Sequence, residues 1–164
     1  MVAFTMRTAR ADDVPWIVEQ EGRPDFVAFI HRWPAETHMA NLTDPDRQYL
    51  IAEAPNGRRL AYVILAGLRG VAPAIELVRM LVAEPGRGLG HALMAQVIAT
   101  AFSELGAARL WLDVFEDNAR ARHVYRRAGF QETEDPRQAA TKADGEPGRL
   151  VIMEIVDAAA SAGR

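Results

Sequence analysis

The chain has 164 residues, of which 49% are hydrophobic and 25% are charged, a composition typical of an ordinary globular domain. A formal net charge of −3 without a basic tail argues against a nucleic-acid partner. The chain contains no cysteine, which excludes disulfides, thiolate metal ligands and a cysteine nucleophile. It also lacks a secretion signal and an apolar run of the roughly 18 residues that span a bilayer. We therefore expect a soluble, cytoplasmic protein with one domain, residues 1–164, and no membrane partner.

Hydrophobic periodicity and turn residues divide the N-terminal half into short elements. A helix capped by Asp12 or Asp13 is expected to run to about Gln20. The other predicted elements are a strand over residues 3–8, short helices over 25–32 and 35–42, and strands over 48–54 and 60–68 that form a hairpin around Asn56-Gly57.

The C-terminal half alternates strands with helices. The predicted elements are strands over 74–82, 109–115, 130–134 and 150–156, helices over 91–105 and 118–128, and a polar, mobile loop over 135–148. The crossover helix makes strands 74–82 and 109–115 parallel neighbours. Together with the early strands, this order predicts a mixed α/β fold with helices on both faces of the sheet.

A glycine-rich turn, Gly86-Arg87-Gly88-Leu89-Gly90, joins strand 74–82 to the next helix. Such a turn at a helix start can hold an anion, because the backbone approaches closely and the first helical N–H groups point at the ligand. A dinucleotide fingerprint is excluded because the sixth position is His91, and no Gly-Lys-Ser or Gly-Lys-Thr completes a P-loop. The spacing alone leaves open a turn that merely joins the two elements.

Two motifs resemble the GNAT superfamily of acetyl-CoA-dependent N-acyltransferases. The family's pyrophosphate loop usually reads [Gln/Arg]-x-x-Gly-x-[Gly/Ala], and the segment from Pro85 to Gly90 fits it except that proline replaces the polar first residue. The family's second signature, N-x-x-A-x-x-x-Y-x-x-x-G-F, is matched at Asn118, Ala121, Tyr125, Gly129 and Phe130. The two motifs cover residues 75–130 in the family's order and spacing.

The resemblance implies a twisted, mostly antiparallel sheet in which two parallel strands splay apart, with helices on both faces. Acetyl-CoA, the expected co-substrate, would lie between strands 74–82 and 109–115. The expected cofactor-binding residues are Met80, Val82, Arg87, Gly88, Leu89, Gly90, His91 and Asn118. Met80 and Val82 would contribute strand backbone, and residues 87–91 would hold the pyrophosphate. Asn118 would bond the cofactor arm, act as a plain helix N-cap, or do both.

By the same resemblance, Tyr125 is the general acid that protonates the departing thiolate; its alternative role is a core tyrosine. Glu76 and Asp113 are the candidates for the general base, and each has a simpler interpretation as a solvated or ion-paired carboxylate. Since water can also carry the proton, the choice stays open. The expected reaction is direct attack of an amine on the thioester in a ternary complex, without an acyl-enzyme.

The resemblance does not identify the acceptor, which we expect to be a protein N-terminus or a small primary amine. In this superfamily the first two helices roof the acceptor site, so Glu21, Trp33 and His38 are expected to line it. We expect no metal site, because the histidines have no ligand spacing, and only the family suggests a homodimer. The alternative function is a non-catalytic acyl-CoA-binding sensor or regulatory module, which the proline at position 85 favours.

Overall fold

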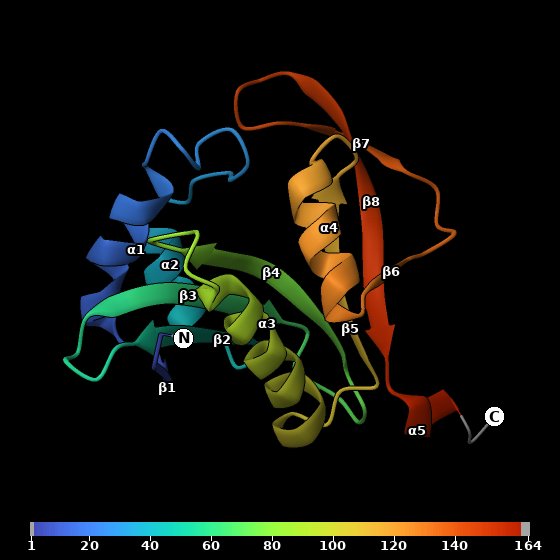
Figure 1. The fold of residues 1–164 in the computed structure, drawn as a ribbon, viewed down its shortest axis with the longest axis horizontal. Coiled ribbons are helices and arrows are strands. Elements are labelled where there is room, and N and C mark those ends of the chain that lie inside the picture. The colour runs from blue at the N-terminus through green and yellow to red at the C-terminus, as the bar shows by residue number, and fades with distance from the viewer. Residues whose placement is uncertain (1, 162–164) are drawn as a thin grey trace.

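The computed structural model describes residues 2–161, and within them lies an 8-stranded sheet in the order β1-β2-β3-β4-β5-β8-β6, with β7 also paired to β8 (Figure 1). The strands are β1 (Thr5–Thr8), β2 (Arg47–Glu53), β3 (Arg59–Ala66), β4 (Ala74–Val82), β5 (Arg109–Phe115), β6 (Gln131–Glu132), β7 (Gln138–Thr141) and β8 (Pro147–Val156). The helices are α1 (Val14–Glu21), α2 (Ala35–Leu42), α3 (Leu89–Ala99), α4 (Ala119–Ala128) and α5 (Ala158–Ser161). A 3₁₀ turn, η1 (Ala11–Asp13), precedes α1, and a π-helical turn, η2 (Thr100–Glu104), extends α3.

Two apolar cores, one on each face of the sheet, hold the helices. On the first face, Leu93 of α3 belongs to the same buried cluster as Leu77 of β4, and Tyr125 of α4 packs at its margin. On the second face, Ile17 of α1 shares a cluster with Tyr62 of β3. Strands buried on both faces are rich in apolar residues rather than alternating. The arrangement confirms the predicted mixed α/β fold with helices on both faces (Figure 1).

The parallel pair β4–β5 separates part of the way along its length. The paired residues are Ala74 with Arg109, Ile75 with Leu110 and Glu76 with Trp111, and the pairing stops there. β4 continues to Val82 and β5 to Phe115, each held by its antiparallel neighbour on the other side. The two strands therefore diverge as the family resemblance implies (Figure 1).

A β-bulge lies in β4 just beyond the point where the pairing stops. Arg79 pairs with Ile64 of β3 and Leu77 pairs with Leu65, so Val78 is an extra residue on β4. Val78 packs with the core on the α1 face, whereas Leu77 and Met80 belong to the core on the α3 face. A bulge bends its strand and increases the local twist, and this one lies where β4 and β5 diverge.

The predicted helix over residues 25–32 is wrong. This segment forms consecutive turns, in which the N–H of Phe29 donates to the carbonyl of Phe26 at 2.9 Å. Phe26 and Ile30 still pack against the core on the α1 face, which explains their helix-like spacing. A helix of this length is marginal by itself, and the Arg79 side chain binds a carbonyl of the segment instead.

The predicted mobile loop over residues 135–148 is also wrong, because it contains β7 and the start of β8. The two strands form a hairpin in which Gln138 pairs with Leu150 and Thr141 with Pro147. The Lys142 N–H closes the turn by donating to the Glu146 carbonyl at 2.8 Å. The hairpin is held by backbone pairing, and its side chains are mostly polar. The sequence therefore has no alternation of apolar residues from which these strands could be predicted.

The other expected elements are present, with β4, β5 and α2 at the predicted bounds. Among the described residues, no helix is both long and apolar enough to cross a bilayer.

Candidate active site

The glycine loop brings the start of α3 to the open end of β4. Gly86 and Gly88 have φ angles of +98° and +76°, which other residues rarely adopt. A Cβ atom at either position would meet no atom within 4 Å, so the loop surface is open there. The first helical bond runs from the Ala92 N–H to the Gly88 carbonyl at 3.3 Å. The N–H groups of residues 89–91 therefore remain available to an anion at the helix start.

The separated edge of β4 is the second part of the site. From Leu77 to Val82 the edge that faces β5 has no strand partner among the described residues. The side chains of Met80 and Val82 pack at the margin of the α3-face core, which leaves their backbone for a ligand. Unpaired strand edges are ready to form a ladder of hydrogen bonds, and an extended chain bearing amides fits this edge.

Tyr125 projects from α4 at the margin of the same core. Its ring lies 5.8 Å from that of Phe130, measured between centroids. None of the described residues forms a hydrogen bond with its hydroxyl. Burial, and secondarily the charge of Asp113, raise the pKa of this phenol above its ordinary value. The phenol therefore stays protonated at neutral pH and can donate a proton.

Asn118 caps α4, as one of its two predicted roles requires. Its side-chain oxygen accepts a hydrogen bond from the Ala121 N–H at 3.2 Å. At the other end of the helix, Gly129 adopts a left-handed φ of +107°. The first and last polar or glycine positions of the signature motif thus cap the two ends of the helix that carries Tyr125.

Glu76 and Asp113 lie on the opposite face from the α3 core, since their strand neighbours Leu77 and Leu112 belong to that core. Neither carboxylate forms a hydrogen bond or an ion pair with the described residues. Burial, and then the charge of Asp113, raise the pKa of Glu76, which is half-buried. Partial loss of water contact also raises the pKa of the more exposed Asp113. The charge of Asp113 influences both Glu76 and Tyr125, and Glu76 and Asp113 lie on the adjacent strands β4 and β5.

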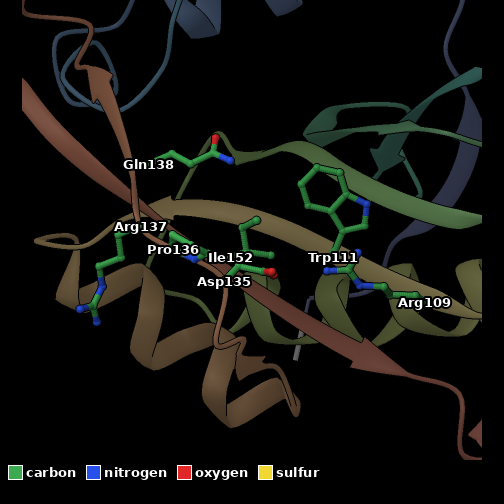
Figure 2. A pocket seen from close by; sticks show the side chains of 7 residues that line it. All are labelled: Arg109, Trp111, Asp135, Pro136, Arg137, Gln138 and Ile152. Atoms are coloured by element: carbon green, nitrogen blue, oxygen red, sulfur yellow. The ribbon is translucent and has the colours of Figure 1, made fainter.

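A pocket of about 320 Å³ lies beside these carboxylates and was not foreseen. It is lined by Arg109, Trp111, Asp135, Pro136, Arg137, Gln138 and Ile152. Figure 2 shows Trp111 and Gln138 on either side of Ile152, whereas the guanidinium of Arg137 points away from them. Trp111 pairs with Glu76 across the parallel strands, and Ile152 pairs with Asp113. Trp111 and Asp113 are two positions apart in the strand RLWLDVF, so alternation could have predicted that they share a face. The segment 135–138 has no periodic pattern that places it in the pocket.

The other polar groups near the site have mainly structural surroundings. Arg122 donates to the Glu116 carbonyl at 2.7 Å and, like Arg126, pairs with Glu132. Glu21 and His38 are buried, with 1% and 0% of their surface exposed, so neither lines an open acceptor site. No group of three or more potential metal ligands occurs among the described residues.

Comparison with known proteins agrees with this geometry. A family profile described as "Acetyltransferase (GNAT) family" matches residues 6–130. The chain therefore belongs to this family, which confirms the resemblance.

Two curated relatives are named "Uncharacterized N-acetyltransferase", one from Mycobacterium tuberculosis (strain ATCC 25618 / H37Rv) and one from Mycobacterium bovis. Each is 40% identical to this chain over 92 residues, which cover 55% of the chain and 56% of the relative. The chain thus matches little more than half the length of these relatives.

Solved structures share the fold over nearly the whole chain. A Vibrio cholerae spermidine N-acetyltransferase, in complex with CoA and spermine, superposes with a TM-score of 0.82 at 17% identity, covering 96% of this chain and 98% of that one. A putative phosphinothricin N-acetyltransferase gives a TM-score of 0.77 at 20% identity, covering 94% and 98%. At such identities the likeness establishes the fold alone.

Proposed function

We propose that this protein transfers an acetyl group from acetyl-CoA to a primary amine. The observation that carries the proposal is the divergence of β4 and β5 beside the open glycine loop, which leaves the β4 edge from Leu77 to Val82 without a partner on the β5 side among the described residues. The polar groups of Glu76 and Tyr125 form no hydrogen bond with the described residues, so they are candidates for contact with a reacting ligand near this edge.

The donor side of the site is built mainly from backbone. The N–H groups at the start of α3, residues 89–91, would bind the pyrophosphate, with Arg87 and the open surface at Gly88 beside it. Backbone groups near Met80 and Val82 would pair with the pantetheine arm, and one N–H there would donate to the thioester oxygen. When bound, acetyl-CoA supplies the activated acetyl group.

The acceptor side supplies the proton chemistry. An ammonium group must lose a proton before its nitrogen can attack the carbonyl, and we propose that Glu76 accepts this proton, directly or through water. Its raised pKa makes it a stronger base than an ordinary glutamate. As the C–S bond breaks, the Tyr125 hydroxyl would protonate the leaving thiolate. The attacking nitrogen would lose its second proton to the Tyr125 phenolate, directly or through water, and Glu76 would release its proton to solvent. The products are then an amide and free CoA.

The proposed acceptor is a small primary amine, with its ammonium group near Glu76 and Asp113. The pocket lined by Trp111 would hold the rest of the amine, and its volume of about 320 Å³ suits a small molecule (Figure 2). The spermidine N-acetyltransferase of similar fold was solved in complex with spermine, so spermidine is the first amine to test. A peptide N-terminus is the second.

Calorimetric titration with acetyl-CoA, CoA, ATP and NAD tests the donor assignment. We expect the two CoA species to bind and the other nucleotides not to bind. Gly88→Glu is the control, because a charged side chain beside the pyrophosphate should abolish this binding by repulsion and by its bulk. Wild-type protein that binds neither CoA species would contradict the proposal.

Thiol release with an amine panel then separates an enzyme from a binding module. The proline at position 85 favours the regulatory alternative, since it removes a side-chain hydrogen bond from the phosphate loop. Binding of acetyl-CoA without amine-dependent thiol release would support that alternative. Release with an amine, lost in Tyr125→Phe, would support the enzyme.

A further inference from the structure

A buried polar cluster beneath the acceptor side has no part in the proposed chemistry. The Glu21 carboxylate, at the end of α1, accepts from the Tyr62 hydroxyl at 2.8 Å and from the Arg79 guanidinium on one oxygen. Its other oxygen lies 3.2 Å from both the Trp33 N–H and the His38 Nε2. Burial opposes the charge, but the bonds from His38 and Tyr62 and the charge of Arg79 outweigh burial and hold the pKa of Glu21 below its ordinary value.

Arg79 connects this cluster to the chain between α1 and α2, residues 22–34, which we call the α1–α2 connection. Its guanidinium donates to the His31 carbonyl at 2.8 Å and lies over the Trp33 ring at 4.4 Å. Because Arg79 follows the bulge of β4, one side chain links that strand, the end of α1 and the connection. Its side chain is 10% exposed, so it is largely shielded from water.

The α1–α2 connection extends across the acceptor side of the site. Near its start, Arg23 donates to the Ala83 carbonyl at 2.5 Å, just before the glycine loop. Near its end, the His31 Nε2 lies 2.8 Å from the Thr141 carbonyl in β7. It therefore reaches from the end of β4 to the β7–β8 hairpin, on either side of the divergent strands (Figure 1). Arg79 holds it between these two contacts.

We propose that Glu21 and Arg79 are positioning residues, which hold the α1–α2 connection in place as the acceptor-side wall without touching either substrate. A buried ion pair has a large desolvation cost, and apolar replacements are often as stable, so such a pair is better suited to fixing one arrangement than to adding stability. This inference rests on the proposed function, since it assigns the connection to the acceptor rather than to acetyl-CoA.

A second buried carboxylate provides a matched control. Asp13, at the opposite end of α1, is 1% exposed and pairs with Arg7 at 2.8 Å and Arg59 at 2.7 Å. None of its contacts among the described residues involves the α1–α2 connection. Loss of either carboxylate removes a buried charge from the same helix, but only the loss of Glu21 should release the connection.

The test compares Glu21→Gln and Arg79→Lys with Asp13→Asn, by hydrogen–deuterium exchange, calorimetry with acetyl-CoA and kinetics with spermidine. We expect exchange in residues 22–34 to quicken by about tenfold or more in the first two variants and not in the third. The KM for spermidine should rise by about tenfold to a hundredfold, as misplaced binding groups produce. The Kd for acetyl-CoA should stay within about twofold, because the proposed donor contacts on β4 are made by its backbone, whereas the Arg79 side chain points to Glu21 and the connection.

Unchanged exchange in residues 22–34, or an equal increase in Asp13→Asn, would overturn the inference. So would a loss of acetyl-CoA affinity as large as the rise in KM. The exchange measurement needs no acceptor, so it remains decisive if spermidine is not turned over. Arg79→Lys keeps the charge while losing the forked geometry, and it decides the matter if Glu21→Gln does not fold. Failure of the wild type to bind acetyl-CoA would instead contradict the proposed function.

Discussion

Two glutamates on the α1 side of the sheet, Glu21 of α1 and Glu76 of β4, differ in the hydrogen bonds that their carboxylates form. Glu21 is enclosed by four donors and its pKa is lowered, whereas Glu76 has no hydrogen bond to the described residues and its pKa is raised. The first carboxylate is stabilised as an ion, whereas the charged form of the second is disfavoured. The contrast teaches that burial alone does not identify the proposed base, because the two carboxylates differ in their hydrogen-bond partners.

The largest expected effect is on stability, and of the two glutamates only Glu21 should lose stability when replaced by glutamine. Glu21→Gln should lower the free energy of unfolding by about 3 kcal/mol, because it leaves Arg79 buried without its counter-charge. Glu76→Gln should leave stability unchanged or raise it near pH 7. A carboxyl whose folded pKa is raised loses stability as pH rises through its unfolded pKa, and glutamine removes that loss. Urea denaturation of both variants at pH 7 measures the difference, and equal losses would remove the contrast.

Tyr125→Phe sharpens the contrast on the catalytic side. The hydroxyl has no partner among the described residues, so its removal should leave stability nearly unchanged. Turnover should fall by about a hundredfold or more, as loss of a general acid does, while acetyl-CoA affinity is retained. Thiol release and calorimetry on the same preparation measure both quantities. Unchanged turnover would exclude Tyr125 as the general acid and favour its alternative role as a core tyrosine.

Trp111→Ala tests whether the pocket beside the unpaired carboxylates binds the acceptor. Loss of the indole should raise the acceptor KM by about tenfold, since apolar contacts of this size contribute such factors. Trp111→Phe should recover most of the affinity. Steady-state kinetics with the best amine of the panel provides the measurement. An unchanged KM in the alanine variant would move the acceptor away from this pocket.

The smallest expected effect is a shift in pH dependence caused by Asp113→Asn. The charge of Asp113 raises the pKa of Glu76, so its removal should lower that pKa. If ionised Glu76 is the base, activity rises with pH through its pKa, and the acidic limb should move to lower pH. The pH profile of kcat/KM checks this direction. A limb that moves to higher pH, or stays in place, would argue against Glu76 as the base.

Local patterns predicted much of the donor side. The bounds of β4 and β5 and the glycine loop followed from strand-like runs and turn residues close together in the chain. The acceptor side depends on contacts between distant segments, such as Arg79 with Glu21, which are 58 positions apart. No periodicity carries that information. The same limit explains the misassigned segment 25–32, whose apolar spacing suggested a helix, whereas tertiary contacts with Arg79 and the core hold it in turns.

The bulge at Val78 also bears on how such a site can arise and be lost. One extra residue in β4 lies just beyond the end of the β4–β5 pairing, and it places Leu77 and Met80, three positions apart, on the same face, as in a regular strand one residue shorter. Gain or loss of a single codon at this point therefore leaves the apolar pattern on either side unchanged. The end of β4 that carries the proposed donor contacts is thus one codon away from a regular strand with the same core faces.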